Sequence, residues 1–174
     1  PGRDAIFLSY LATIMVPHVV TMIPVFILLR SLRLIDTYSA LILPAIFSAY
    51  GTFMLRQFFL SVPRELEDAA RIDGCSHWQV YRYIIMPMSR PAIAALAVFA
   101  FLVTWNSFMW PLIVINSTEK MPLMLGLYAF MGQHSIDWHL LMAASVMTMA
   151  PAVLAFILAQ RHFIQALLVK PIPG

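Results

Sequence analysis

Residues 67–91 read EDAARIDGCSHWQVYRYIIMPMSRP. This charged stretch lies between long runs without charge, and that arrangement decides the fold. Hydrophobic residues make up 61% of the chain and charged residues only 11%, which is far from the balance of soluble proteins. Backbone amides in lipid have no water to bond, and the chain lacks the alternating pattern of a membrane barrel. The sequence therefore predicts an all-α, polytopic transmembrane helical bundle.

Four apolar stretches approach or exceed the roughly 20 residues that a helix needs to cross a bilayer. We expect spans at about 5–29, 37–56, 91–115 and 138–160, with a cytoplasmic hairpin at 61–90. No linker or soluble domain of useful size interrupts them. Residues 1–174 are therefore expected to form a single transmembrane domain.

The basic residues predict the orientation of the spans, because Lys and Arg are retained on the cytoplasmic side of a membrane. Placing both termini and the hairpin in the cytoplasm gives that side eight basic residues and the opposite side three. The eight are Arg3, Arg56, Arg64, Arg71, Arg82, Arg90, Arg161 and Lys170; the three are Arg30, Arg33 and Lys120. Because these residues flank spans and form no stripe, they do not indicate nucleic-acid binding.

Local signals in the hairpin predict a helix, a tight turn and a second helix. Pro63 suits the first turn of a helix, and Gly74 suits the left-handed residue that ends one. Ser76 and Gln79, three residues apart, form a capping box that starts the second helix. We expect Pro87 to end that helix.

The hairpin resembles the "EAA" coupling loop of permease subunits of ATP-binding-cassette (ABC) importers. That loop runs roughly E-A-A-x-x-D-G-A and continues with an aromatic residue, an aliphatic residue and two prolines. The matching residues are Glu67, Ala70, Asp73, Gly74, Tyr81, Ile84, Pro87 and Pro91. Two departures are Asp68, where the family often has alanine, and Cys75, which replaces the usual alanine after the glycine.

The rest of the chain is similar to the last four of about six helices in permeases of the maltose and carbohydrate type. The similar stretches are Pro1-Gly2-Arg3, Asp36-Thr37, Leu43-Pro44, residues 55–59, Trp105-Asn106 with Trp110-Pro111, and Ala159-Gln160-Arg161 with Phe163. The resemblance implies a type I ABC importer permease fold that is N-terminally truncated here. It also implies a multi-pass protein of a bacterial-type inner membrane.

The resemblance further implies how work is divided between subunits. The loop would dock on a cytoplasmic ABC ATPase dimer, with Glu67 making a charged contact and with Asp73, Gly74 and Cys75 at the tip. Tyr81, Ile84 and Pro87 would fix the hairpin against the permease body. The other implied partners are a second homologous permease subunit, an extracytoplasmic solute-binding protein and membrane lipid.

The implied function is the translocation path for a sugar or oligosaccharide, and a polyol or glycerol phosphate is the nearest alternative. The chain has no G-x-x-x-x-G-K-[ST] phosphate-binding loop. We therefore expect a non-catalytic subunit without a cofactor, with ATP and Mg²⁺ bound by the partner ATPase. The five histidines lack metal-binding spacing, so no metal site is expected. A passive channel or a helical scaffold is the alternative from a different class.

Aromatic and amide side chains in the spans are candidates for the substrate path. Trp105, Asn106 and Trp110 lie in the third expected span, and Tyr50 lies in the second. The group in the third span suits stacking on a sugar and hydrogen bonding to it, but helix packing and an interfacial aromatic belt explain that group equally well. For Tyr50, packing between helices is the favoured interpretation. The external loop 116–137 is expected to face the binding protein through Glu119, Lys120, Gln133, His134 and Asp137.

Overall fold

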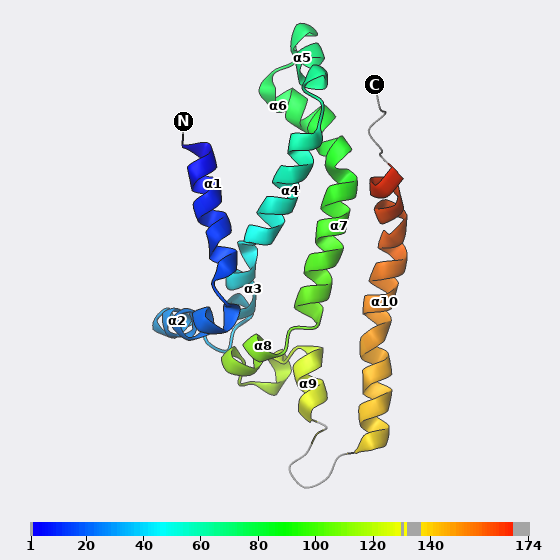
Figure 1. The fold of residues 1–174 in the computed structure, drawn as a ribbon. Helices are drawn as coiled ribbons and strands as arrows, with labels where there is room; N and C mark the ends of the chain where they lie inside the picture. The colour runs from blue at the N-terminus through cyan, green and yellow to red at the C-terminus, as the bar shows by residue number, and fades with distance from the viewer. Residues whose placement is uncertain (1, 130, 132–136, 169–174) are drawn as a thin grey trace. The chain divides into compact units, whose positions relative to one another are not determined.

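The computed structural model describes residues 2–129, 131 and 137–168, and these residues are predominantly helical (Figure 1). The chain divides into two compact units. The first unit is Pro1–Ala49 with Phe101–Leu154, and the second is Tyr50–Ala100 with Ala155–Gly174. For the described residues, the all-α prediction is confirmed.

The first unit begins with two helices that meet at a sharp bend. Helix α1 (Arg3–Ala12) continues into the 3-10 turn η1 (Thr13–Met15), and α2 (His18–Ser31) follows at 101°. Val16 has ψ 117° because a residue before proline is sterically pushed out of the helical region, and Pro17, the N-cap residue of α2, has ψ 131°. The stretch expected as one span over 5–29 is thus a bent pair of helices.

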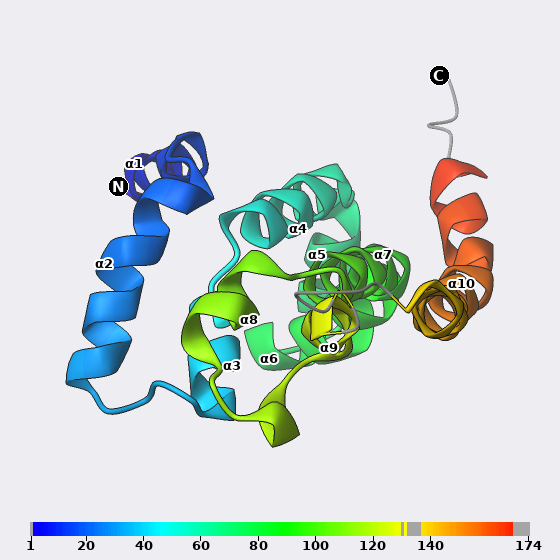
Figure 2. The same ribbon diagram turned by 90° about the horizontal axis from the view of Figure 1, so that it is seen from below.

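Helix α8 packs on α2 and α3 to form the core of the first unit. Helix α3 (Tyr38–Ile46) starts at Thr37, whose Oγ1 accepts a hydrogen bond from the Ala40 N–H. Figure 2 shows α8 (Met109–Val114) beside α3. Buried residues of this core are Met22, Leu29, Ala40, Trp110, Val114 and Ile115. The 3-10 turn η3 (Thr118–Lys120) and α9 (Leu123–Ala129) follow α8.

The second unit contains most of α4 (Ala49–Ser61) and of α7 (Met86–Trp105). Between them come α5 (Arg64–Ile72), the short α6 (His77–Val80) and the π-helical turn η2 (Tyr81–Ile85). Figure 1 shows α5 and α6 beyond the adjoining ends of α4 and α7. Because α7 ends at Trp105 and α8 begins at Met109, the span expected over 91–115 is divided between two helices.

Three described helical stretches are long and apolar enough to cross a membrane: Tyr38–Ser61, His77–Trp105 and Trp138–Gln160. The last is part of α10 (Trp138–Leu168), a continuous helix that contains Pro151. The bent α1–α2 pair is a fourth candidate if it crosses as one broken span. Large apolar side chains such as Met15 and Phe47 are more than three-quarters exposed, as suits surfaces covered by lipid or by other subunits.

Candidate functional site

The candidate coupling hairpin begins with α5, whose first turn is acidic. Pro63 is the N-cap residue, with φ −60° and ψ 131°, and Glu65 and Glu67 lie in the first turn. Carboxylates there interact favourably with the helix dipole, as does Arg71 in the last turn. The charge pattern of the sequence thus favours a helix at this place.

A Schellman turn ends α5 at the tip of the hairpin. The Cys75 N–H donates to the Ala70 carbonyl at 2.9 Å, and the Gly74 N–H donates to the Arg71 carbonyl at 3.0 Å. Gly74 has φ +82°, a conformation that costs a residue with a Cβ about 1–2 kcal/mol. The predicted glycine stop is therefore confirmed, and both bonds satisfy carbonyls that the helix end would otherwise leave free.

The predicted capping box starts α6. The Ser76 N–H donates to Gln79 Oε1 at 2.7 Å, and the Gln79 N–H donates to Ser76 Oγ at 3.4 Å. Across the turn, Arg71 Nη2 lies 3.4 Å from His77 Nε2. The capping box thus fixes the start of α6, and the contact between Arg71 and His77 joins α6 to α5 at the tip of the hairpin.

The second helix continues through Pro87, and the expectation that this residue would end it is wrong. Helix α6 passes through η2 into α7, and Pro87 is the second residue of α7. In a regular helix its ring would clash with the carbonyl four residues earlier; here a wider π turn immediately precedes it. Ser89, which is fully buried, donates to the Ile85 carbonyl at 2.6 Å. Pro91 also lies inside α7.

The hairpin exposes apolar side chains around its turn. Ala70 and Val80 are buried, whereas Ile72 is 87% exposed and Trp78 is 68% exposed. The Trp78 ring lies against Tyr81 with centroids 5.4 Å apart. Glu67 is half-buried and has no side-chain hydrogen bond or ion pair to another described residue. A rigid turn with an apolar tip and free carboxylates is chemically suited to docking on another protein.

The remaining predicted hairpin residues are spread over different degrees of burial. Asp73 is an exposed C-cap residue, and Cys75 is a half-buried free thiol. Ile84 is half-buried, whereas Tyr81 and Pro87 are exposed. The predicted hairpin residues thus lie on consecutive elements, α5 to the start of α7, and Asp73 and Gly74 at the turn are exposed.

The polar groups of three substrate-path candidates already have partners within the first unit. Trp105 Nε1 donates to the Thr148 carbonyl at 3.1 Å, and Asn106 Nδ2 donates to the Leu102 carbonyl at 2.7 Å. Trp110 is buried, and its Nε1 donates to the Ala40 carbonyl at 3.0 Å.

Trp110 also borders a largely apolar cavity of about 520 Å³. The cavity is lined by residues of α2, α3, α7 and α8 and by Leu32 and Ser107, which lie just beyond helix ends. In the second unit, the ring of Tyr50 lies 4.9 Å from that of Phe99, measured between centroids.

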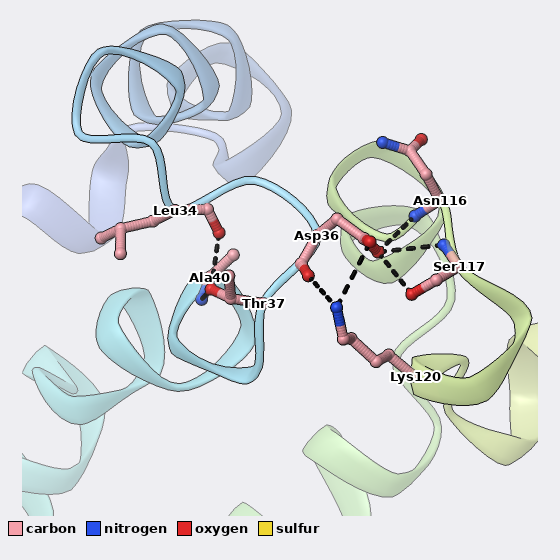
Figure 3. A network of polar contacts seen from close by, with 7 residues as sticks. All are labelled: Leu34, Asp36, Thr37, Ala40, Asn116, Ser117 and Lys120. Carbon is pink, nitrogen blue, oxygen red and sulfur yellow. Dashed lines mark hydrogen bonds and ion pairs between the residues drawn. The ribbon is translucent and has the colours of Figure 1, made fainter.

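Asp36 ties the loop before α3 to the loop after α8 (Figure 3). Its Oδ1 accepts from the N–H groups of Asn116 and Ser117 and from Ser117 Oγ, each at 2.9 Å. Lys120 Nζ donates to the Asp36 carbonyl at 2.7 Å and lies 3.4 Å from Oδ2. The backbone bonds from Ser117 and Asn116, and after them the Ser117 hydroxyl, hold the pKa of Asp36 well below its usual range.

Comparison with known proteins identifies the family. Residues 1–169 match the family described as "Binding-protein-dependent transport system inner membrane component". The chain belongs to this family. Its resemblance to ABC importer permeases, predicted from the EAA-type loop, is confirmed.

Similar curated proteins of this family are permeases of sugar or glycerol phosphate transport systems. The arabinooligosaccharides permease AraQ of Halalkalibacterium halodurans is 41% identical over 99% of this chain and 62% of its own length. The lactose permease LacG of Rhizobium radiobacter is 36% identical over 95% and 61%. The sn-glycerol-3-phosphate permease UgpE of Salmonella choleraesuis is 36% identical over 96% and 60%. The chain thus spans about three-fifths of the length of these relatives.

A solved structure shares the fold. A chain of a bacterial ABC transporter involved in the import of the acidic polysaccharide alginate matches with a TM-score of 0.80 and 23% identity, over 93% of this chain and 62% of that one. This likeness supports the permease fold proposed from the sequence.

The segment 116–137, which is expected to face outward, is described except for residues 130 and 132–136. Glu119 and Lys120 lie in η3, and Asp137 immediately precedes α10. Gln133 and His134 lie outside the described residues. The sequence predicted Lys120 as a residue of the loop that faces the binding protein, and its contacts with Asp36 were not predicted. The sequence did hold a signal for this contact: Asp36 and Lys120 have opposite charges and lie in loops on the same predicted side of the membrane.

Proposed function

We propose that this chain is the membrane-spanning part of an ABC importer permease and that it couples to a cytoplasmic ATPase through the hairpin at residues 61–90. The observation that carries the proposal is the rigid turn at Gly74, which presents Ile72 at 87% exposure beside unpaired carboxylates. An exposed aliphatic side chain on a fixed turn is a suitable anchor for a pocket on a partner.

In this proposal ATP and Mg²⁺ bind to the partner ATPase, and this subunit transmits movement to its spans. A second permease subunit and an extracytoplasmic solute-binding protein complete the importer. Both described ends of the chain face the cytoplasm, since that orientation puts most basic residues on the inner side. The loops around Asp36 and Lys120 then face outward, toward the binding protein.

An oligosaccharide is the proposed solute. The names of AraQ and LacG support this class, whereas UgpE favours a glycerol phosphate as the second candidate. Uptake of radiolabelled arabinooligosaccharide, lactose and glycerol 3-phosphate by cells that carry the complete transporter would separate the candidates. Dependence of uptake on a functional ATPase separates an importer from a passive channel or scaffold.

Copurification of the complete subunit with its ATPase tests the coupling role. We expect wild type to retain the ATPase, Ile72→Asp to lose it, and the matched Ile72→Leu variant to keep it. Glu67→Ala is expected to weaken retention because it removes a carboxylate without removing the helix. Membrane insertion should be unchanged in all variants, since Ile72 is almost fully exposed.

Retention of the ATPase by Ile72→Asp and Glu67→Ala at the wild-type level would contradict docking through the hairpin. Solute uptake that continues without a functional ATPase would contradict the importer assignment itself.

A further inference from the structure

The groove formed by η2 and the first half of α7 combines two arginines with an apolar floor. Its volume is about 580 Å³, and its lining includes Arg82, Tyr83 and Arg90 toward one end and Ile93, Ala94 and Ala97 along the other. All of these residues belong to the second unit. The positive-inside rule places the arginine end at the cytoplasmic surface of this span.

The π turn explains why both arginines line the same groove. In a regular α-helix, residues eight positions apart differ by about 80° around the axis beyond two full turns. The wider turn at Tyr81–Ile85 accommodates about one extra residue. Arg82 and Arg90 are thereby brought close to the same face, about two turns apart.

Neither guanidinium has an anionic partner within the described residues. No hydrogen bond or ion pair joins Arg82 or Arg90 to a described side chain, and both are exposed. No acidic residue lines the groove. Unpaired arginines at the edge of a membrane span favour an anion there, and a phosphate oxygen is a good hydrogen-bond acceptor for guanidinium.

The other half of the groove suits a hydrocarbon chain. Ala94 and Ala97 are small, so they leave a shallow channel along the helix surface beside Ile93. Tyr83 is 70% exposed at the arginine end, where amphipathic rings commonly sit at the level of lipid headgroups. Along the helix, Arg82 and Tyr83 come first, Met86, Pro87 and Arg90 follow, and the stretch from Ile93 to Ala97 is wholly apolar. Both cations thus precede the aliphatic stretch, as the headgroup of a phospholipid precedes its acyl chains at the edge of a bilayer.

We propose that this groove binds an anionic phospholipid of the cytoplasmic leaflet. Arg82 and Arg90 hold its phosphate, and one acyl chain lies along Ile93, Ala94 and Ala97. Charge complementarity favours this occupant over a protein helix, which would have to bring its own carboxylates to the two arginines. The site is separate from the ATPase-docking turn at Gly74, and it does not depend on which solute is carried.

Native mass spectrometry of the complete transporter in nanodiscs tests this site. The probe is phosphatidylglycerol, with phosphatidylcholine of the same chain length as the neutral comparison. We expect phosphatidylglycerol to be retained preferentially, and Arg82→Gln with Arg90→Gln to lower its retention about tenfold or more, since two charge-assisted contacts are lost. Arg64→Gln, which removes a cation from α5 outside the groove, should leave retention unchanged.

Ala94→Leu should lower lipid retention without a change in charge, and Arg90→Lys should restore part of the retention that Arg90→Gln loses.

Equal lipid retention by wild type and by the variant with both arginines replaced would overturn the proposal, as would equal retention of the two lipids. Displacement by excess inorganic phosphate would indicate a free-anion site. Loss of subunit assembly in Ala94→Leu without a change in retained lipid would show that protein covers the groove. ATP-driven uptake is a separate readout, so failure of this proposal does not decide the importer function.

Discussion

Lys120 Nζ lies 2.7 Å from the main-chain carbonyl oxygen of Asp36, although the two residues are 84 positions apart in the sequence. Asp36 has φ +59°, a left-handed conformation that is uncommon outside glycine and better tolerated by Asp and Asn. The lysine and the N–H groups that contact the carboxylate hold this residue in place. The pair thus joins the loop before α3 to the loop after α8.

Asp36→Ala should lower the thermal midpoint of the transporter more than Asp36→Asn. Alanine removes the acceptor for two N–H groups and one hydroxyl, and it also tolerates φ +59° poorly, whereas asparagine keeps an oxygen and the conformation. Ser117→Ala, which removes a single hydroxyl donor, should cost about 1 kcal/mol. Scanning fluorimetry in detergent measures these changes. Equal midpoints for the alanine and asparagine variants at Asp36 would contradict this account.

The contribution of the Asp36 carboxylate should disappear in acid. Its pKa is lower in the folded protein than in the unfolded chain, so its stabilisation is complete above the ordinary carboxyl pKa of about 4 and is lost as the pH falls below it. The difference in midpoint between wild type and Asp36→Asn should be constant from pH 7 to about pH 5 and should shrink toward pH 3. A difference that stays constant down to pH 3 would argue against the role of the charge.

Substitutions at Gly74 should destabilise the hairpin in the order Val, Ala, Asn. An added Cβ meets no atom within 4 Å, so the cost comes from φ +82° and not from a clash. Alanine should cost about 1–2 kcal/mol, valine more and asparagine least. Limited proteolysis between α5 and α6 would follow local opening. If the order followed side-chain volume alone, with Asn worse than Ala, a steric cause would replace the conformational one.

Ser76→Ala should weaken the start of α6 by about 1 kcal/mol, because the Gln79 N–H loses its side-chain acceptor. Ser76→Asp keeps a good N-cap and serves as the matched control. Hydrogen exchange of the Gln79 amide reports the effect directly, and faster exchange is expected only in the alanine variant. Unchanged protection in Ser76→Ala would show that Gln79 does not depend on this cap.

Trp110→Phe should reduce stability by about 1 kcal/mol, because it removes the donor to the Ala40 carbonyl while keeping most of the buried ring. Trp110→Ala should cost about 3–5 kcal/mol through the cavity that it leaves. Thermal melting and solute uptake are measured on the same preparations. A change in apparent solute affinity in Trp110→Phe, with no loss of stability, would instead place Trp110 in the substrate path.

The hairpin was predictable because its signals are local. Ser76 and Gln79 are three residues apart, and the Gly74 turn satisfies carbonyls only three and five residues earlier. By contrast, the prediction that Pro87 would end the helix was wrong, because the effect of a proline depends on the turn before it. A proline ends a regular helix, but it is accommodated after the π turn at Tyr81–Ile85.

The substrate-path candidates were less predictable because the sequence does not state their partners. Asn106 donates to a carbonyl only four residues earlier, in the last turn of α7. The indole groups of Trp105 and Trp110 instead donate to carbonyls 43 and 70 residues away. Such partners depend on which helices pack together. The sequence therefore left packing and solute contact equally open.

The sequence by itself determined that the chain is helical, that it contains stretches apolar enough to span a membrane, and that it carries an EAA-type hairpin. These properties depend on composition and on interactions between residues a few positions apart. Only the tertiary structure decided the 101° bend between α1 and α2, the contact of Asp36 with Lys120, and the alignment of Arg82 with Arg90. The bend depends on how the chain leaves the helical conformation at Val16 and Pro17, and the alignment of the arginines depends on the π turn at Tyr81–Ile85. The contact of Asp36 with Lys120 depends on chain packing that brings distant loops together.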